Sequence, residues 1–361
     1  MLITARLRPR PSKGGTELLT LRQLAGLAGV STSTVSKALN NSPDISAETR
    51  DQILELATRH GYQRKFRKKS AAKPGISGPK IGLIYSDVVS RYYSKLIQAY
   101  NVKLGAMDGV LLACDAQFSP KRAIELCNYL DQQCHVDGII SIYGSLELFA
   151  SLPRTRAPLV GSLGINALDA LVNGSFPYDY ICVNAKTGLS QAVDFLVRNG
   201  HRRIAFLGET RSRLRQDIVV DLLEQAGLPL QPGYLRVTEH RFEEAGYETM
   251  HALLEEGLRP TAVLCGYDDI AVGASKAIFE AGLRIPEDIS LIGYDNTRVR
   301  LYNQRMLASV NSFVEDQVRI VMAMLMKRIS GPSDRVIQNV SLQTAFLPYE
   351  TAGPAPADEN R

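Results

Sequence analysis

The stretch LRQLAGLAGVSTSTVSKALN, residues 21–40, decides the fold of the N-terminal part of this chain. Its first eight residues place leucine or alanine at i, i+3, i+4 and i+7, which gives a helix over 21–28 one apolar face. Gly29 ends this helix, because glycine adopts the left-handed backbone that a helix stop needs. Ser31 is a good N-cap for a second helix. The pattern therefore predicts two helices joined by a tight turn, which Val30 fills.

The second helix has two different faces. Val35, Ala38 and Leu39 point back to the first helix, whereas the opposite face holds short polar side chains, one lysine and no acid. Such a face suits the base edges and phosphates of a DNA major groove. The alternative, an ordinary helical hairpin, is disfavoured because small residues hold all the constrained positions of the turn. The polar face consists of Thr32, Ser33, Ser36, Lys37 and Asn40.

The run from Thr20 to Tyr62 resembles the headpiece of the lactose-repressor (LacI/GalR) family, and the chain to about residue 350 resembles the sensor core of that family. The resemblance implies an N-terminal three-helix helix-turn-helix headpiece and an α/β core of two doubly wound, periplasmic-binding-protein-like lobes. It further implies a ligand in the cleft between the lobes. By the same resemblance Thr32, Ser33 and Lys37 reach base edges, and the phosphates are held by Thr20, Thr34, Ser36 and Asn40.

The basic linker that follows the headpiece departs from the family. The family forms a short hinge helix on DNA, whose leucine wedges into the minor groove. This chain has Ala71 at the leucine position, and alanine is too short for that wedge. We therefore expect a non-specific electrostatic clamp on phosphates. Its cations are Arg64, Lys65, Arg67, Lys68 and Lys69.

The composition indicates a globular protein with a basic head and an acidic body. Of 361 residues, 45% are hydrophobic and 22% charged, which suffices for two or three domains. Residues 1–80 hold 15 Lys/Arg against 5 Asp/Glu, whereas the other 281 hold 27 against 32. This asymmetry fits one polyanion-binding end. Since no membrane span or secretory leader is recognisable, we expect a bacterial cytoplasmic, nucleoid-associated protein without a membrane partner.

Enzymatic and metal-binding patterns are absent from the sequence. The five cysteines lack metal-ligand spacing and are interpreted as reduced core residues. No glycine-rich phosphate loop, GxSxG elbow or HExxH pair occurs. The five histidines are scattered, and His201 is expected to be structural. We therefore expect no catalytic residue, no metal and no cofactor.

From Lys80 onward, short runs of Ile, Val and Leu alternate with helical segments, as in buried parallel strands of an α/β protein. The expected parts are a disordered basic tail (1–17), the headpiece (18–62), the linker (63–79), the two-lobe core (80–350) and a mobile tail (351–361). Within the core, lobe one takes 80–186 and 312–335, and lobe two takes 187–311 and 336–350. Strands are expected at 81–85, 110–114, 138–143, 158–163, 203–208, 261–266 and 289–294, and helices at 121–133, 187–199, 218–226, 242–256 and 270–281.

Ligands in open α/β sheets lie beyond the carboxyl ends of the strands. Reading off these ends places Asp87, Tyr143, Tyr267, Asp268 and Asp295 among the candidate effector-binding residues. The alternative for Asp268 and Asp295 is that they only cap the helices that follow.

The resemblance adds an arginine and two departures. The family motif R-x-x-G-F maps by spacing onto Arg215, although its Gly-Phe part is missing and Arg213 competes for the role. The family's Asn-Asp pair has Tyr267 in the place of asparagine, and the Asp that often ends the fourth strand is Leu163 here. Both departures weaken the case for a simple sugar and leave room for a larger, flatter, amphipathic or anionic ligand.

These features together predict a homodimeric transcription regulator, a repressor by family default. It would bind a pseudo-palindromic operator with an affinity set by a small molecule, a sugar or related metabolite, between the lobes. One alternative is a regulator of the same fold whose cleft binds no metabolite and which answers to a protein partner or to concentration. The other is a solute-binding protein with the same two-lobe core.

Overall fold

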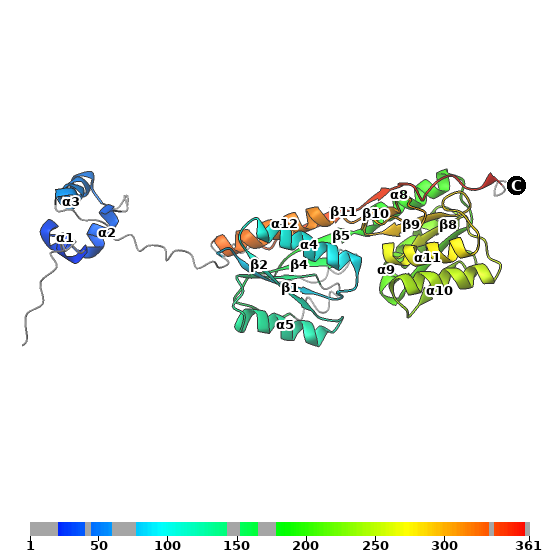
Figure 1. Cartoon of the computed structure of the whole chain (residues 1–361), viewed down its shortest axis with the longest axis horizontal. Coiled ribbons are helices and arrows are strands. Elements are labelled where there is room, and N and C mark those ends of the chain that lie inside the picture. Colours follow the sequence, from blue (N-terminus) through cyan, green and yellow to red (C-terminus); the bar gives the residue numbers. More distant parts are fainter. Residues whose placement is uncertain are drawn as a thin grey trace, which may run out of the picture. The chain divides into compact units, whose positions relative to one another are not determined.

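The structure is a computed structural model in which residues 21–39, 45–59, 77–142, 152–164, 178–331 and 336–357 are described. The chain divides into two units, Met1–Gly75 and Ile76–Arg361 (Figure 1). The expected tail 1–17 lies outside the described residues. So does the linker up to residue 76, including Ala71 and the five expected cations Arg64, Lys65, Arg67, Lys68 and Lys69.

The first unit contains three helices, α1 (Leu21–Ala28), α2 (Thr32–Leu39) and α3 (Ala47–Arg59). The predicted helix 21–28 is confirmed, and Gly29 after it has a left-handed backbone with φ of 66°. Leu24, Val35 and Ile53, one from each helix, are fully buried or nearly so and form the centre of a small core. The helices are therefore held by their apolar faces.

Serine side chains begin the second and third helices, and the cap at Ser31 confirms the prediction from the sequence. The Oγ of Ser31 accepts a hydrogen bond from the backbone N–H of Thr34 at 3.1 Å. The Oγ of Ser46 accepts one from the N–H of Thr49 at 3.3 Å. Each bond satisfies a backbone donor that the first helical turn leaves free.

The second unit contains two six-stranded sheets among its described residues, and we call each sheet with its helices a lobe. In lobe one the strand order is β11-β5-β4-β3-β1-β2, and every ladder is parallel. Helices α4 and α12 cover one face of this sheet and α5 the other (Figure 1). The elements are β1 (Lys80–Tyr85), α4 (Arg91–Gly105), β2 (Val110–Asp115), α5 (Pro120–Gln132), β3 (Gly138–Ser141), β4 (Leu159–Gly164), β5 (Asp179–Asn184), α12 (Val314–Ser330) and β11 (Asn339–Gln343).

In lobe two the strand order is β12-β10-β9-β8-β6-β7, and only β12 runs antiparallel to its neighbour. Its buried side chains form one continuous apolar core. The elements are α8 (Ala185–Arg198), β6 (Ile204–Glu209), the 3₁₀ turn η1 (Thr210–Ser212), α9 (Arg213–Gln225), β7 (Leu235–Thr238), α10 (Phe242–Glu255), β8 (Ala262–Cys265), α11 (Asp268–Glu280), β9 (Ser290–Tyr294), β10 (Ala308–Asn311) and β12 (Ala345–Leu347). None of the described helices has the length and apolarity to span a membrane.

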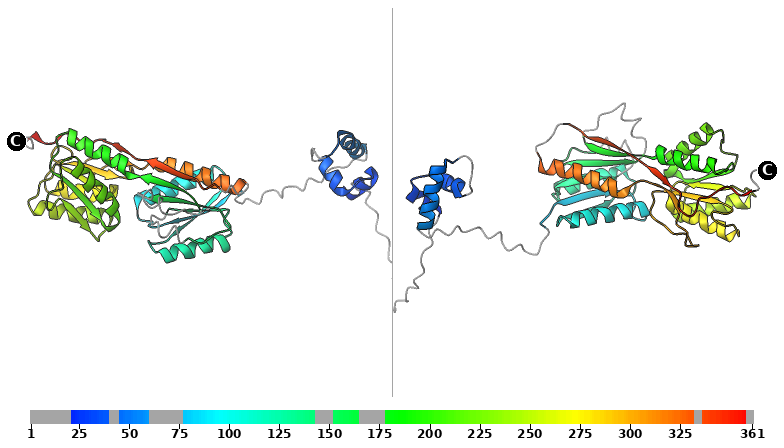
Figure 2. Two further views of the ribbon diagram at one scale, coloured as in Figure 1. Left: turned by 180° about the vertical axis from the view of Figure 1, so that it is seen from behind. Right: turned by 90° about the horizontal axis from the view of Figure 1, so that it is seen from above.

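The chain passes between the lobes three times, after β5, after β10 and between β11 and β12. The last passage corrects an expected boundary, which assigned 336–350 to lobe two. Strand β11 pairs in parallel with β5 of lobe one, with Val340 opposite Ile181, and only β12 joins lobe two. Both views of Figure 2 show this segment running from one lobe into the other.

The expected mobile tail, 351–361, is also corrected for the part that the structure describes. Thr351 is buried, and its hydroxyl donates to the carbonyl of Leu291 and accepts from the N–H of Ala308, both at 2.7 Å. Further on, the Gly353 carbonyl lies 3.0 Å from Nε2 of His201, whose Nδ1 lies 3.0 Å from the Thr261 hydroxyl. These bonds hold the segment on lobe two and confirm His201 as a structural residue.

Helices α10 and α11 pack backbone against backbone. A Cβ atom at Gly246 would lie 1.8 Å from the carbonyl oxygen of Ile270, and one at Gly273 would lie 1.8 Å from that of Glu243. Both distances are shorter than any non-bonded contact, so only glycine allows this approach. The contact places the first turns of the two helices next to each other.

We expect Gly273→Ala to destabilise lobe two by roughly 1–3 kcal/mol, because the new methyl group must push the helices apart. The measurement is the midpoint of thermal unfolding of the full chain. Gly105→Ala is the matched control, since its Cβ would meet open space. An unchanged midpoint for Gly273→Ala would contradict the backbone contact.

Candidate functional site

The outer face of α2 is the first candidate site. Thr32, Ser33 and Lys37 are exposed on it, whereas Thr34 is half-buried. Ser36 lies within α2, and the structure does not describe the side-chain placement there. Thr20 and Asn40 lie outside the described residues. The described part of this face thus presents two hydroxyls and one ammonium group to solvent.

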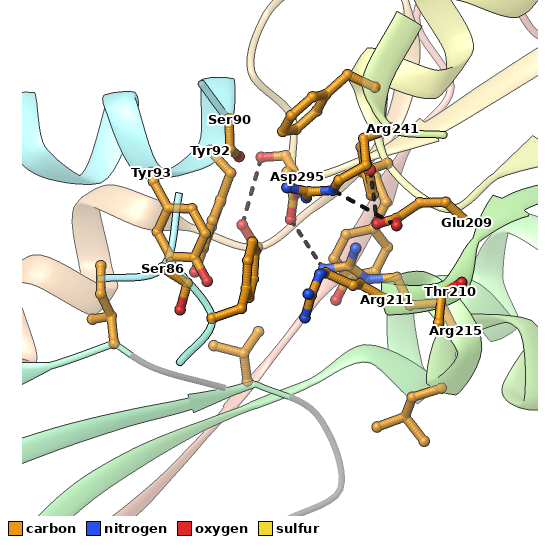
Figure 3. Close-up of a pocket in the computed structure, with 18 of the residues that line it drawn as sticks. Ser86, Ser90, Tyr92, Tyr93, Glu209, Thr210, Arg211, Arg215, Arg241 and Asp295 are labelled. Atoms are coloured by element: carbon orange, nitrogen blue, oxygen red, sulfur yellow. Dashed lines mark hydrogen bonds and ion pairs between the residues drawn. The ribbon is translucent and has the colours of Figure 1, made fainter. Parts of the chain in front are cut away.

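The second candidate site is a cavity of about 440 Å³ between the two lobes (Figure 3). This volume falls within the range of small-molecule sites. The cavity lies where strands of both sheets end, as parallel α/β sheets predict. Lobe one contributes Ser86, Ser90, Tyr92, Tyr93, Phe118, Ile142, Ser162 and Val183. Lobe two contributes Glu209, Thr210, Arg211, Leu214, Arg215, Arg241, Phe242, Tyr267, Tyr294 and Asp295, and Ser312 comes from the passage between the lobes.

Three of the expected effector-binding residues line this cavity, namely Arg215, Tyr267 and Asp295. Asp87 reaches it indirectly, through an ion pair with Arg241. The competing Arg213 is exposed and does not line the cavity. Leu163 lies within β4 and its side-chain placement is not described, and Tyr143 lies outside the described residues.

Asp268 is the expected residue that the structure places elsewhere. Asp268 is 1% exposed and does not line the cavity, and its carboxylate binds the loop after β9. It accepts hydrogen bonds from the N–H and hydroxyl of Thr297, at 2.6 and 2.8 Å, and from the Ser309 hydroxyl at 2.7 Å. It therefore holds the loop that carries Asp295, which has a left-handed backbone with φ of 99°. Asp268 is a positioning residue and not a lining one.

Arg215 is fixed by three contacts from lobe two. Its Nη1 donates to the Gly266 carbonyl at 2.9 Å, and its guanidinium carbon lies 4.0 Å from the ring centroid of Tyr294. Its Nη2 lies 3.5 Å from Oδ1 of Asp295. Burial raises the pKa of Asp295 to about 6, although Arg215 opposes the change. The Nε of Arg215 and the Oδ1 of Asp295 make no hydrogen bond to the described part of the chain.

Arg241, which precedes α10, links the two lobes. Its guanidinium pairs with Asp87 of lobe one and lies 3.7 Å from Oε2 of Glu209 in lobe two. It also lies over two rings, with its central carbon 4.9 Å from the centroid of Phe118 and 4.3 Å from that of Phe242. One side chain thus contacts an acid and an aromatic ring on each side of the cavity.

Further polar contacts join the lobes at the side of α4. Arg91 pairs with Asp269 and, at 2.7 Å, with Glu243. The ammonium group of Lys95 donates to the carbonyl of Asn296 at 3.1 Å. The lobes are therefore closed by their own side chains while the cavity between them stays open.

Several lining residues were not predicted from the sequence, and their positions explain why. Arg241 and Phe242 follow β7, a short and half-exposed strand that the apolar-run criterion does not detect. Tyr92 and Tyr93 lie in the first turn of α4, and Phe118 in the loop after β2. A search of every helix start that follows a strand would have included most of them. The missed residues with rings or cations are Tyr92, Tyr93, Phe118, Arg211, Arg241, Phe242 and Tyr294.

Comparison with known proteins gives two matching families. Residues 20–65 match bacterial regulatory proteins of the lacI family, and residues 193–347 match a periplasmic binding protein-like domain. The chain is 30% identical over 337 residues to the probable HTH-type transcriptional repressor ExuR of Bacillus subtilis (strain 168), covering 89% of this chain and 96% of that protein. The chain belongs to the LacI family. It is also 28% identical over 323 residues to catabolite control protein A of Priestia megaterium, covering 86% and 92%.

Solved structures of LacI-family regulators share the fold. The lac repressor dimer bound to operator and the anti-inducer ONPF matches with a TM-score of 0.64 at 24% identity, covering 93% of this chain and all of that one. A complex of the transcriptional regulator CelR with cellobiose matches with a TM-score of 0.62 at 23% identity, covering 92% and 99%. The headpiece and two-lobe architecture predicted from the sequence are thus confirmed.

The first prediction from the site concerns pH. Burial raises the pKa of Asp268 from 3.8 to about 7, so the folded protein keeps a proton that the unfolded chain releases near pH 4. The contribution of Asp268 to the free energy of unfolding is then fully present below pH 4 and is lost as the pH rises through 7. The loss amounts to at most about 4 kcal/mol. We expect Asp268→Asn to flatten the decline in unfolding free energy between pH 5 and 8.

Urea unfolding at pH 5, 6, 7 and 8 measures this effect. Asp217→Asn serves as control, because Asp217 is exposed on α9. It should follow the wild-type curve. A wild-type pH dependence in Asp268→Asn would show that this buried carboxyl does not titrate in the window.

The second prediction concerns closure. Arg91→Gln removes both ion pairs of Arg91, whose side chain is 40% exposed, so we expect a shift of roughly 1 kcal/mol toward the open lobes. This is about fivefold in the equilibrium. Hydrogen exchange measured by mass spectrometry should be faster in peptides from 86–93 and 209–215. Arg319→Gln, which breaks only a pair within α12, should leave them unchanged, and equal exchange in both variants would count against the Arg91 contact.

Proposed function

We propose that the chain is a dimeric repressor of transcription that binds a pseudo-palindromic operator and responds to a small molecule in the cavity between its lobes. The observation that carries the proposal is the combination, in one LacI-family chain, of a polar α2 face and an open cavity at the strand ends of both sheets. Relatives are named as transcriptional repressors, which favours regulation and not catalysis.

On DNA, α2 would lie in the major groove. Thr32, Ser33 and Lys37 would contact base edges, and two headpieces would dock in successive grooves. Thr20, Thr34, Ser36 and Asn40 would contact phosphates and set the register. The linker cations Arg64, Lys65, Arg67, Lys68 and Lys69 would add a clamp on phosphates that does not depend on sequence. The lac repressor, which shares this fold, was crystallised as a dimer bound to operator, and this supports the arrangement by analogy.

The effector would act by linkage. A molecule in the cavity touches both lobes, so it binds more tightly to one closure angle than to others and shifts the equilibrium toward it. The closure angle would set the spacing of the linkers and thereby the affinity for DNA. DNA would in return change the affinity for the effector by the same factor.

A regulator whose cleft binds no metabolite is the second candidate. The cross-lobe contacts of Arg91 and Arg241 favour it, because they close the lobes without a ligand. The cavity disfavours it, because the described side chains leave about 440 Å³ between the lobes. We therefore place the effector-responsive repressor first.

Two variants, Lys37→Ala and Arg67→Ala, test how the protein recognises DNA. Their binding is measured on an operator obtained by in vitro selection. Lys37→Ala should relax the base preference at one position, by roughly 1–3 kcal/mol. Arg67→Ala should weaken all sequences alike and lower the slope of log affinity against log salt by about 1. Fluorescence anisotropy on single-base operator variants gives both values. An unchanged ranking of operator variants for Lys37→Ala would show that Lys37 does not read bases.

A further inference from the structure

Three arginines and three acids lie at the cavity, but the acids are not distributed evenly among the arginines. Arg241 faces two acids, Asp87 and Glu209. Arg215 faces one, Asp295. Arg211 lines the same cavity and pairs with no carboxylate among the residues that the structure describes. One end of the cavity therefore carries a cation that the described carboxylates leave uncompensated.

An aromatic ring holds Arg211 in place at the cavity. Its guanidinium carbon lies 3.6 Å from the ring centroid of Phe118, which belongs to the opposite lobe. Arg241 lies over the same ring at 4.9 Å. The contact with Phe118 holds the guanidinium group of Arg211 without neutralising its charge, whereas Arg241 is compensated by Asp87 and Glu209. An anion beside Arg211 would compensate its charge, and guanidinium groups are well suited to carboxylate and phosphate.

Arg211 and Arg215 share one short segment of chain. Arg211 lies in η1 and Arg215 in the first turn of α9, so only three residues separate the two arginines. Figure 3 shows both side chains on the lobe-two side of the cavity. The Nε of Arg215 has no hydrogen-bond partner among the described residues, so it still has a proton to donate.

The other walls define the rest of the ligand. Oδ1 of Asp295 is buried and makes no hydrogen bond to the described chain, so it can accept one from a ligand hydroxyl or N–H. Rings of Tyr92, Tyr93 and Tyr267 line the cavity and suit an apolar or flat ligand face. About 440 Å³ leaves room for a molecule of the size of a monosaccharide derivative or a nucleotide.

We infer that the effector is a small organic anion, whose carboxylate or phosphate is held by Arg211 and Arg215 and whose hydroxyl or N–H donates to Asp295. The inference rests on the proposed function, since it takes the cavity to be the effector site. Arg211 is the residue that selects charged ligands over neutral ligands of the same shape.

Calorimetric titration of the full chain with matched ligand sets tests the inference. One set is a hexose, its uronic acid and its 6-phosphate, and a second is a nucleoside and its 5′-monophosphate. We expect the anionic members of one set to bind at least tenfold more tightly than the neutral member. The uronic acid and the phosphates distinguish the two anionic groups.

Variants of neighbouring arginines then assign the selectivity. Arg211→Gln should weaken the anionic ligand at least tenfold and leave the neutral member of the set within twofold. Arg211→Lys should restore part of the loss. Arg213→Gln is the matched control, because Arg213 lies two residues away and is exposed like Arg211, but does not line the cavity. It should bind like the wild type.

The outcomes separate this inference from the proposed function. Tight binding of a neutral member, or an anion whose affinity Arg211→Gln leaves unchanged, would overturn the inference and leave the effector-responsive repressor standing. Failure of every member of both sets to bind the folded protein would count against an effector site in the cavity, and so against both proposals.

Discussion

Charges buried between the two lobes form the constraint on which the rest of the core depends. An ionised group that leaves water must find a partner, because its desolvation costs several kcal/mol. In this molecule, Arg241 and Arg91 each find partners across the cleft, Asp87 for one and Asp269 for the other. Separation of the lobes breaks both ion pairs and returns the charged groups to water, whereas removal of one partner in the closed state leaves the other charge without compensation. Closure of the lobes and burial of charge are therefore a single event.

The backbone makes this arrangement possible. Parallel strands bring the ends of β1, β6, β8 and β9 to facing edges of two sheets, so side chains from distant parts of the sequence meet in one cavity. The glycine contact between α10 and α11 places Glu243 and Asp269 close enough to bind one arginine. Asp268 holds the loop that carries Asp295 through its hydrogen bonds to Thr297. The loop of the lining residue Asp295 is thus positioned by a carboxylate that does not itself line the cavity.

Much of the fold could be predicted from the sequence because its signals are local. The apolar spacing in 21–39 and the caps at Ser31 and Ser46 involve neighbours within one or two helical turns. Seven strands are apolar runs, and all of these except the half-exposed β2 are buried. Strands β5, β7, β10, β11 and β12 were not predicted. Of these, β7 and β11 alternate exposed with half-buried residues over four or five positions, so a window of hydropathy does not distinguish them from loops. The buried strands β5 and β10 are short and contain polar residues, as DYICVN and ASVN, which interrupt the apolar pattern. The assignment of β11 to lobe one depends on its register with β5, which no local pattern encodes.

The site was predictable only in part, for a related reason. Arg215, Tyr267 and Asp295 follow strands that the sequence reveals, and they line the cavity. Arg241 follows β7. Because β7 was not predicted, Arg241 was not recognised as a residue at the end of a strand. Asp268 also follows a revealed strand, yet its carboxylate turns to Thr297 and Ser309. Chain position gives the edge of the sheet at which a residue lies, but side-chain direction is decided by the hydrogen bonds that burial makes obligatory.

The strength of the cross-lobe contacts sets how far an effector can shift the closure of the lobes. Arg91 is partly exposed, so its pairs contribute only roughly 1 kcal/mol. The partners of Arg241 are buried, so desolvation offsets much of the attraction in its pairs. Allosteric coupling in proteins typically amounts to about 1–3 kcal/mol. If the closed state were favoured by far more than this range, effector binding could not shift the equilibrium. If it were favoured by far less, the lobes of the free protein would be open. Because the pairs at Arg91 and Arg241 act on the same motion, their free energies combine, and an effector can tip the equilibrium only when the difference between its affinities for the two states is of similar size.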